Sequence, residues 1–313
     1  MAHNRRPSTG RRVIIIGAGI HGLAAAKTYL EMVPDIQLTI IDNGDSVGGV
    51  WSRSRVHSNL MADSSTPTFD FSDLQMSEEF DIPEWSSIPG PIVHEYLERY
   101  AKKFDIVHRC VFNTQVTSVE KEGRGWKVHT KKSGEAAIAK RQTLTCDVLM
   151  VATGHFSVPK LPNIDISAFE GKTFHTKDVN ERSDELLSKD IETIAVVGGN
   201  KSSFEAVCLS YKAGKNIHWL IREEGAGPAL LMRTQLPNGI STSKIGYTRF
   251  VSMFFPTIYS NSRNWWDRLV VSGGNAWGKK LFEWFWRSTT NNRIGDRYEK
   301  SENGRLLKPK ILK

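Results

Sequence analysis

The sequence predicts an α/β protein in which two similar units follow one another along the chain. Three observations carry this prediction. A short β-branched run at 13–16 leads into a glycine turn and a helix. Strand and helix patterns then alternate, as in parallel α/β sheets, and the order strand, glycine turn, helix, strand returns from Ile194. At 313 residues, of which 39% are hydrophobic, the chain is long enough for two domains of roughly 150 residues.

The elements of the first unit follow from apolar periodicity and from breakers. The first helix ends before Pro34, and the second has Pro91 in its first turn and apolar residues every three or four positions. The segment "KEGRG" separates two strand patterns and predicts a hairpin. The predicted elements are strand 13–16, helix 20–32, strand 37–41, helix 91–104, strands 116–120 and 126–130, and a strand ending at Gly154.

The second unit is predicted from "IAVVGGNKSSFEAVCLSYKAGKNIHWLIR" at 194–222. A buried strand precedes two glycines, and a helix and a further strand follow. Phe204, Val207, Cys208 and Tyr211 recur at helical spacing and predict one apolar helix face. Gly214 is the predicted C-cap of that helix.

The net charge of +8 is concentrated in two tails. Residues 1–12 carry +4 and residues 296–313 carry +3, which favours flexible, solvated tails over a nucleic-acid interface, with a contact to phosphate or to an anionic membrane as the alternative. The cysteines at 110, 146 and 208 lie far apart, so the sequence predicts neither disulfides nor a metal site. It predicts a cytoplasmic location instead. No window reaches the roughly 18 continuous apolar residues of a membrane span.

The first glycine turn has the spacing of a dinucleotide-binding (Rossmann-like) unit. Gly17 allows the tight turn, Gly19 lets the backbone approach a diphosphate, and Gly22 lets the helix pack close to the strand. Asp42 lies 20 residues after Gly22, at the end of the next strand, where a carboxylate accepts hydrogen bonds from a ribose. The alternative is a packing turn that binds nothing.

A second glycine pair follows Asp42 in "NGDSVGGVW". Gly48 and Gly49, next to Trp51, let backbone amides approach a long ligand a second time. An extended FAD needs this second approach and NAD does not. The residue pattern therefore favours FAD in the first unit.

From these motifs onward the sequence resembles the flavin-containing monooxygenases and their Baeyer–Villiger relatives, in particular fungal biosynthetic members. "FNTQVTSV" resembles a family segment in which Gln115 and Val116 present backbone to the adenine. "FEGKTFHTKDV" is similar to the family's F-x-G-x-x-x-H motif through Phe169, Gly171 and His175, and His175 is implied to order the linker. The family's aromatic residue four places later is replaced by Val179.

The resemblance also implies a domain organisation. We expect a basic flexible tail over 1–12, an FAD-binding domain over 13–158, an interdomain linker over 159–190 and an NADPH-binding domain over 191–313. Family members return to complete the FAD domain with a further strand and a closing helix, and we do not find that pattern before residue 313. The alternative expectation is thus a truncated flavoprotein, acting as an NADPH oxidase or a non-enzymatic binding partner.

The turn of the second unit, "GGNKSS", departs from G-x-G-x-x-G. Gly198 and Gly199 are present, whereas Asn200 and Ser203 stand at the other glycine positions. Lys201 and the hydroxyls of Ser202 and Ser203 are candidates to hold a diphosphate beside the helix N-terminus. Arg222 stands where an NAD site carries a carboxylate, so NADPH is the predicted reductant. The alternative pairs Arg222 with Glu223 or Glu224.

A bound flavin with a nicotinamide reductant leaves two main chemistries. A disulfide reductase needs paired cysteines, and the sequence has none. The resemblance implies an enzyme that transfers one oxygen atom of O2 to a small organic substrate of secondary metabolism, by Baeyer–Villiger oxidation, hydroxylation or heteroatom oxidation. Oligomeric state is not predicted.

Asp63 is the candidate catalytic residue. It falls where N- and S-oxidising members carry an asparagine and is closer to the aspartate of Baeyer–Villiger members. An ionised carboxylate only accepts hydrogen bonds, so this assignment requires a cationic partner. The alternative is that Asp63 caps a turn with Ser64 and Ser65.

An aromatic-rich insertion covers residues 250–286. Its aromatic residues are candidates for a bulky apolar substrate pocket, a peripheral membrane contact or ordinary domain packing. They are Phe254, Phe255, Trp265, Trp266, Trp277, Trp284 and Trp286.

Overall fold

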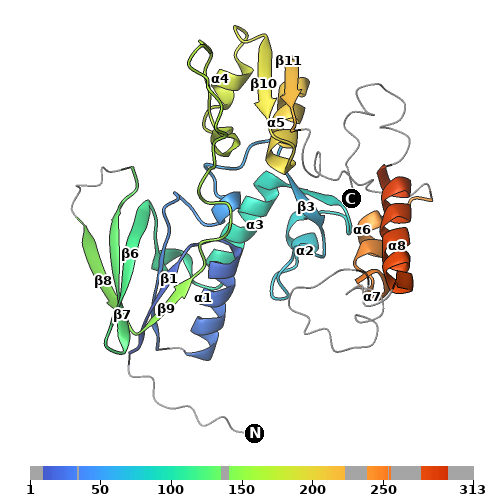
Figure 1. The fold of residues 1–313 in the computed structure, drawn as a ribbon. Helices are drawn as coiled ribbons and strands as arrows, with labels where there is room; N and C mark the ends of the chain where they lie inside the picture. The colour runs from blue at the N-terminus through green and yellow to red at the C-terminus, as the bar shows by residue number, and fades with distance from the viewer. Residues whose placement is uncertain are drawn as a thin grey trace. The chain divides into compact units, whose positions relative to one another are not determined.

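The computed structural model describes residues 10–33, 35–134, 141–222, 238–252, 254 and 276–294 (Figure 1). The chain divides into two compact units. Unit 1 comprises residues 1–62 and 89–186, and unit 2 comprises residues 63–88 and 187–313. Each unit is described here by itself.

Unit 1 is built on a parallel sheet with the strand order β5-β2-β1-β9. The strands are β1 (Arg12–Ile16), β2 (Gln37–Ile41), β5 (Cys110–Val111) and β9 (Val148–Val151). The helices are α1 (Ile20–Met32) and α3 (Gly90–Lys103), with short helices η1 (Gly49–Trp51) and η2 (Val107–Arg109). The predicted α/β class and the first three elements are confirmed, and α3 begins and ends one residue earlier than expected.

A three-stranded antiparallel sheet, β6-β7-β8, is inserted in the chain between β5 and β9 of the parallel sheet. The strands are β6 (Thr114–Glu122), β7 (Gly125–Lys132) and β8 (Gln142–Cys146). The predicted hairpin around Gly123 is confirmed, with longer strands, while β8 was not predicted. Val128 and Cys146 of this sheet pack with Ile14 and Ile41 of the parallel sheet in one buried cluster.

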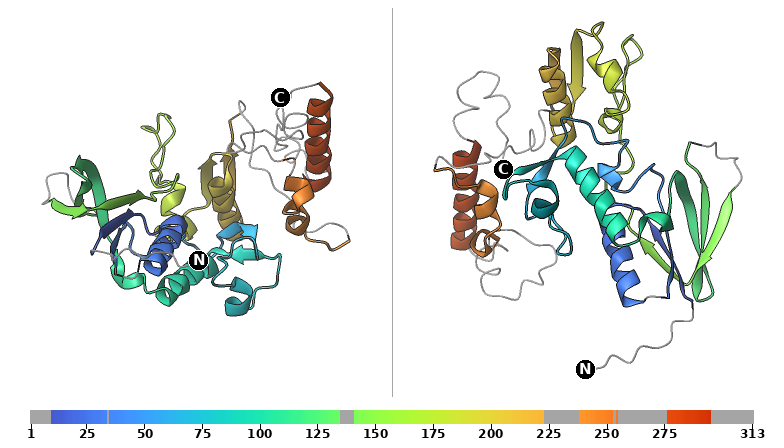
Figure 2. Two further views of the ribbon diagram at one scale, coloured as in Figure 1. Left: turned by 90° about the horizontal axis from the view of Figure 1, so that it is seen from below. Right: turned by 180° about the vertical axis from the view of Figure 1, so that it is seen from behind.

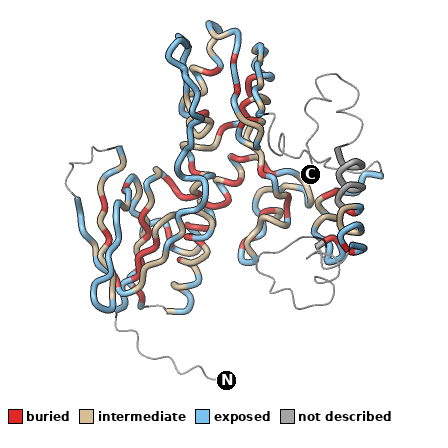
Figure 3. Tube along the Cα trace, viewed as in Figure 1, coloured by how far each residue is buried: buried red, intermediate tan, exposed pale blue. Residues whose placement is uncertain are grey.

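The apolar pattern of the sequence accounts for the core of unit 1. In α3 the buried face is formed by Val93, Tyr96, Leu97 and Tyr100, and in β1 and β2 the buried β-branched residues are Val13, Ile14, Ile15, Ile40 and Ile41. Figure 3 shows the buried residues in red along the Cα trace. Beyond α3, the remaining elements of the unit are η3 (Thr176–Asp178) and α4 (Ser183–Leu187).

Unit 2 contains two small sheets. The strands β10 (Thr193–Val197) and β11 (Asn216–Leu220) are parallel, and α5 (Lys201–Lys212) connects them as predicted. The strands β3 (Met61–Ser65) and β4 (Ser87–Pro89) pair beside α2 (Met76–Phe80). The helices α6 (Thr242–Gly246), α7 (Arg249–Ser252) and α8 (Ala276–Ile294) complete the described part of the unit.

The buried face of α5 differs from the expected one. Ser203, Ala206 and Leu209 are buried, whereas Tyr211, from the predicted apolar face, is 76% exposed. Ser203 can be buried because its hydroxyl donates to the carbonyl oxygen of Asn200 (2.5 Å). Gly214 ends the helix with a φ of +72°, as expected of a C-cap.

The aromatic-rich insertion is partly described. Phe254 stacks on Phe285 of α8, with ring centroids 3.9 Å apart, and both are buried with Val251 of α7, which lies beside α8 in each view of Figure 2. Trp277 and Trp284 are exposed. Phe255, Trp265 and Trp266 lie outside the described residues, as does the side chain of Trp286. None of the helices in the described ranges combines the length and apolarity needed to cross a bilayer.

Candidate functional site

The first glycine turn, residues 17–22, joins β1 to α1 and excludes a side chain at two positions. Gly17 has a φ of +108°, and a Cβ there would overlap the backbone oxygen of Ala152. A Cβ on Gly22 would overlap the carbonyl oxygen of Gly17. These two glycines therefore serve the tight turn and the close packing of helix on strand.

Gly19 has a different environment. Its φ is −76°, which any residue adopts, and the nearest atom to a Cβ placed on it would be the Cα of Gly49 at 3.8 Å. Gly48 also donates its N–H to the carbonyl of Ala18 (2.9 Å). The structure thus brings the two glycine motifs of the sequence together, and their facing backbones leave room that side chains would fill. A dinucleotide diphosphate requires such an approach to the backbone.

The N-terminus of α1 suits an anion. Gly19 is its N-cap and supplies no side-chain hydrogen bond, and the first turn carries no acidic residue. The first N–H groups of a helix lack partners within the helix and carry partial positive charge. A diphosphate placed between Gly19 and Gly49 would receive hydrogen bonds from these groups. The geometry therefore fits FAD.

Asp42 is fixed by the backbone of unit 1. Its Oδ2 accepts from the N–H of Ala18 (2.6 Å) and its Oδ1 accepts from the N–H of Gly44 (2.7 Å). Each carboxylate oxygen can accept a further hydrogen bond. Asp42 is thereby held beside the first glycine turn with acceptor capacity remaining for a ribose.

The start of β6 lies against the same residue. Thr114 donates its N–H to the carbonyl of Asp42 (2.9 Å), so Gln115 and Val116 follow immediately after a backbone contact with the acidic residue. Gln115 is exposed, and Val116 packs against the buried cluster around Ile14. This placement agrees with a role of their backbone beside the adenosine part of a nucleotide.

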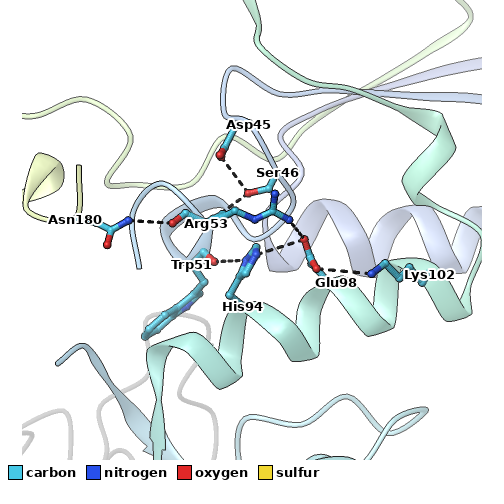
Figure 4. A network of polar contacts seen from close by, with 8 residues as sticks. All are labelled: Asp45, Ser46, Trp51, Arg53, His94, Glu98, Lys102 and Asn180. Carbon is cyan, nitrogen blue, oxygen red and sulfur yellow. Dashed lines mark hydrogen bonds and ion pairs between the residues drawn. The ribbon is translucent and has the colours of Figure 1, made fainter. Parts of the chain in front are cut away.

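Helix α3 holds the loop that carries Trp51 (Figure 4). The Nδ1 of His94 lies 2.9 Å from the carbonyl oxygen of Trp51, and its Nε2 lies 3.4 Å from the Oε1 of Glu98. The same Glu98 oxygen accepts from Arg53 (2.6 Å), and Lys102 lies 3.7 Å from the other. The sequence analysis missed His94 and Glu98. Their i, i+4 spacing on α3 was the available signal.

Two further groups fix this loop, residues 48–54, from other directions. The hydroxyl of Ser46 accepts from the N–H of Arg53 (2.9 Å). The amide of Asn180 donates to the carbonyl oxygens of Arg53 and Ser54, both at 3.1 Å. Loop 48–54 is therefore held by α3, by the segment after β2 and by the linker.

His175 orders the linker itself. Its Nδ1 accepts from the N–H of Lys177 (3.0 Å) and caps η3, which places Asn180 shortly afterwards. Val179, which stands where the family carries an aromatic residue, is buried. The geometry agrees with the ordering role implied for His175.

Arg55 is a second residue that the sequence analysis missed. Its guanidinium donates to the carbonyl oxygen of Phe156 (3.4 Å). Burial lowers the pKa of Arg55 from its ordinary value, and the charges of Asp178 and Asp42 oppose that effect. A partly buried cation therefore lies close enough to Asp42 to interact with it electrostatically.

The three cysteines are free thiols. Burial raises the pKa of Cys110 to about 12, and the charge of Asp42 adds to the effect. Burial likewise raises the pKa of Cys146 and of Cys208. All three are therefore protonated at neutral pH, which does not suit a thiolate nucleophile. In the described ranges no group of three or more His, Cys, Asp and Glu residues could hold a metal ion.

The turn of unit 2, residues 198–203, differs from that of unit 1 at its helix. The N-cap residue Asn200 accepts the N–H of Lys201 with its own side chain (2.9 Å). Gly198, with a φ of +130°, donates its N–H to Leu220, and its carbonyl accepts from the indole of Trp219 (2.7 Å). The turn is well fixed, but one helix N–H that glycine would leave open is satisfied by Asn200.

Lys201 bridges two carboxylates. Its Nζ lies 2.9 Å from the Oδ1 of Asp63 and 2.9 Å from the Oε1 of Glu205. Burial lowers the pKa of Lys201, but the hydrogen bonds to Asp63 and Glu205 outweigh it and the pKa is raised above its ordinary value. The structure thus supplies the cationic partner that Asp63 requires, and brings together two residues predicted separately. Asp63, Ser64 and Ser65 all lie in strand β3, so the alternative in which Asp63 caps a turn with these two serines is not found.

The other predicted residues of unit 2 are accessible. Ser202 is exposed at the first turn of α5, and Gly199 is partly buried. Arg222 is exposed two residues after β11. Glu223 and Glu224, its alternative partners, lie outside the described residues.

Comparisons with known proteins place this geometry in a family. A family model described as pyridine nucleotide-disulphide oxidoreductase matches residues 14–231. The chain belongs to this family. The match covers both glycine turns and the linker between them, so the family assignment includes every element that carries a predicted nucleotide contact.

The most similar relatives include fungal monooxygenases. An FAD-dependent monooxygenase of Pyrenophora dematioidea is 33% identical over 311 residues, covering 95% of this chain and 55% of that protein. The FAD-dependent monooxygenase resA of Aspergillus sclerotiorum is 34% identical over 309 residues, covering 95% of this chain and 52% of the relative. The resemblance inferred from the motifs is confirmed. The chain spans about half the length of these curated relatives.

A solved structure supports the fold assignment. A cyclohexanone monooxygenase mutant from Rhodococcus sp. Phi1 bound to NADP⁺ has a TM-score of 0.61 and 19% identity, covering 97% of this chain and 61% of that chain. At this identity the likeness concerns the fold, and it confirms the predicted pair of Rossmann-like units.

Proposed function

We propose that the chain is the FAD- and NADPH-binding part of a flavin-dependent monooxygenase. The observation that supports this most directly is the approach of Gly19 to Gly49, beside an α1 N-terminus without a side-chain cap. Two facing glycine turns suit the diphosphate of a long dinucleotide. The fungal relatives, described as FAD-dependent monooxygenases, point to the same cofactor and the same class of reaction.

The roles of the unit 1 residues follow from their positions. Gly17 and Gly22 shape the turn, Gly19 and Gly49 face the diphosphate, and Asp42 accepts hydrogen bonds from the ribose. Gln115 and Val116 present backbone to the adenine, and Trp51 stands in the loop held by His94. When bound, the flavin would supply the reaction with O2, and the protein would orient it and exclude water around it.

In unit 2 the proposed ligand is NADPH. Gly198 and Gly199 form the turn, while Lys201 and Ser202 lie at the start of α5, where a diphosphate binds. Arg222 contacts the 2′-phosphate that distinguishes NADPH from NADH, because a guanidinium matches a phosphate in shape and charge. The structural relative bound to NADP⁺ agrees with this assignment.

The proposed reaction transfers one oxygen atom of O2 to a small organic substrate of secondary metabolism. Asp63 is the proposed catalytic residue, and its carboxylate lies 2.9 Å from the ammonium of Lys201. An ionised aspartate suits Baeyer–Villiger oxidation or hydroxylation better than simple N-oxidation, in which the family uses an amide. We also propose a cytoplasmic protein, with the exposed Trp277 and Trp284 as the candidate residues of a peripheral membrane contact.

The absorbance of the purified protein tests the cofactor assignment. A flavin spectrum that persists through desalting, together with bleaching of that spectrum by NADPH under anaerobic conditions, is the expected result. A protein that is folded by circular dichroism but retains no flavin after incubation with excess FAD would contradict the proposal.

A further inference from the structure

We propose that Lys201 exchanges partners, holding Asp63 in the free protein and the diphosphate of the nucleotide when it binds, so that nucleotide binding releases Asp63. This inference rests on the NADPH site of the proposed function. It adds a positioning role for Lys201 that couples the occupancy of the site to the state of the candidate catalytic carboxylate.

The geometry places one cation between two acids at the start of a helix. Lys201 is the first residue of α5, and its Nζ is equidistant from Asp63 and Glu205, at 2.9 Å. The diphosphate of a nucleotide in this turn would face the same helix N-terminus. The carboxylate of Asp63 and the diphosphate of the nucleotide would therefore compete for the ammonium of Lys201.

The two acids differ in how firmly they are held. The side chain of Glu205 is only 10% exposed and lies one helical turn from Lys201, at i, i+4 on the same helix. The side chain of Asp63 is 78% exposed and belongs to a different segment of the chain. An exposed ion pair contributes little to stability because water and salt screen it. Asp63 is thus the partner that can leave.

Charge decides the direction of the exchange. One ammonium between two carboxylates leaves a net charge of −1, and a diphosphate adds further negative charge at the same place. Both negative groups cannot stay beside Lys201 without repulsion. A diphosphate also gains the N–H groups of the α5 N-terminus, which the Asp63 carboxylate does not use in this structure. The nucleotide therefore displaces Asp63.

Calorimetric titration with NADP⁺ tests the exchange in four proteins: wild type, Asp63→Asn, Lys201→Met and the double variant. Asp63→Asn removes the competitor, so we expect NADP⁺ to bind about two- to fivefold more tightly than to wild type. Lys201→Met is expected to weaken binding. In the Lys201→Met background, Asp63→Asn is expected to change the affinity by less than about 1.5-fold, because the site of competition is gone.

Asp81→Asn is the matched control. It removes the same charge from the same 63–88 segment, and its left-handed backbone (φ +51°) is one that asparagine accepts. We expect no change in NADP⁺ affinity for this variant. Lys201→Arg keeps a cation at the site, so this variant should still bind NADP⁺. Adding Asp63→Asn to Lys201→Arg should raise its NADP⁺ affinity, as it does in the wild type.

The outcomes separate the two proposals. If folded wild-type protein binds no NADP⁺ in the millimolar range, the nucleotide site itself is refuted, and the exchange with it. If NADP⁺ binds and Asp63→Asn leaves the affinity unchanged or weakens it, the exchange alone is refuted. An equal gain on Asp63→Asn in the wild-type and Lys201→Met backgrounds would also refute it, because that pattern reflects general charge and not Lys201.

Discussion

Gly19 and Gly22 stand three residues apart and have separable roles. A side chain on Gly22 would strike the backbone of the turn, whereas one on Gly19 would meet only the Cα of Gly49 at an ordinary contact distance. The motif assigned these two roles by position, and the contacts of the two glycines agree with that division between ligand and fold.

We predict that Gly19→Ala abolishes flavin retention without unfolding the protein. The added methyl is compatible with φ −76° but stands where the diphosphate approaches the backbone. The flavin absorbance after desalting should fall to background while the Tm changes by less than about 3 °C. Gly246→Ala, at an open position in α6, is the control and should retain flavin. Full occupancy in Gly19→Ala would refute the assignment.

Gly22→Ala should instead damage the fold. Its Cβ overlaps a backbone oxygen that cannot move aside, and overpacking of this kind costs about 1–3 kcal/mol or more. Denaturant unfolding followed by circular dichroism should show a lower midpoint than for Gly19→Ala. Equal stability of the two variants would contradict the division of roles.

Arg222→Ala should weaken NADPH binding far more than NADH binding. The lost charge-assisted contact to the 2′-phosphate corresponds to about 1.5–3 kcal/mol. Titration with each nucleotide measures the ratio, and Arg124→Ala, which removes the same charge from the β6–β7 turn, should leave it unchanged. Equal losses of affinity for NADPH and NADH would contradict the contact between Arg222 and the 2′-phosphate.

At the scale of elements, helices are positioned by polar contacts that hydrophobic patterning does not reveal. The face of α3 that enters the core was predictable from its apolar spacing. The contact between His94 and the carbonyl of Trp51 was not, because a histidine and a glutamate at i, i+4 are common on solvated helix faces. Likewise, the buried face of α5 includes Ser203 and Ser210, whose small polar side chains carry no apolar signal.

His94→Ala is predicted to weaken FAD binding about fivefold, which corresponds to the loss of roughly 1 kcal/mol for one hydrogen bond to loop 48–54. Fluorescence titration of flavin-free protein gives the affinity. Glu95→Ala, on the exposed side of α3 where Glu95 pairs with Arg99, is the control and should bind FAD normally. An unchanged affinity for His94→Ala would show that the loop does not depend on α3.

The ion pairs of Glu185 in α4 with Arg182 and Lys172 give a pH-dependent prediction for stability. Hydrogen bonds from Arg182 and Lys172 lower the pKa of Glu185 from its ordinary 4.5 to about 2. Because the folded-state pKa is depressed, the stabilisation is present above pH 4.5 and is lost as the pH falls toward 2. The Tm difference between wild type and Glu185→Gln should therefore be largest near pH 6 and shrink below pH 4.5. A difference independent of pH would contradict this.

At the scale of the whole molecule, the order of elements was predictable and the grouping of segments was not. Repeated strand, glycine turn and helix patterns defined both Rossmann-like units because their periodicities are local. Residues 63–88 cluster with unit 2. Their sequence is polar and has no sustained apolar repeat, so no local pattern indicates that they pack with residues after 187. The contact of Asp63 with Lys201 depends on residues 138 positions apart along the chain.

Because the two proposed nucleotide sites lie in separate units, a substitution in one site should leave ligand binding at the other unchanged. We predict that Gly19→Ala, which loses the flavin, binds NADP⁺ with wild-type affinity, and that Arg222→Ala retains the flavin fully. Calorimetry with NADP⁺ and flavin absorbance on the same preparations provide both measurements. Loss of both FAD and NADP⁺ binding in either variant would contradict the assignment of Gly19 and Arg222 to two separate sites.

The carboxylate of Asp42 ties the first glycine turn to the end of β2, because it accepts hydrogen bonds from the N–H groups of Ala18 and Gly44. The first turn therefore has its binding shape in advance, and the incoming dinucleotide does not have to order it. Preorganisation of this kind lowers the entropy lost on binding. The recombination of flavin with the apoprotein should consequently follow a single second-order phase, with a rate that rises in proportion to flavin concentration and shows no slower ordering step of the loop.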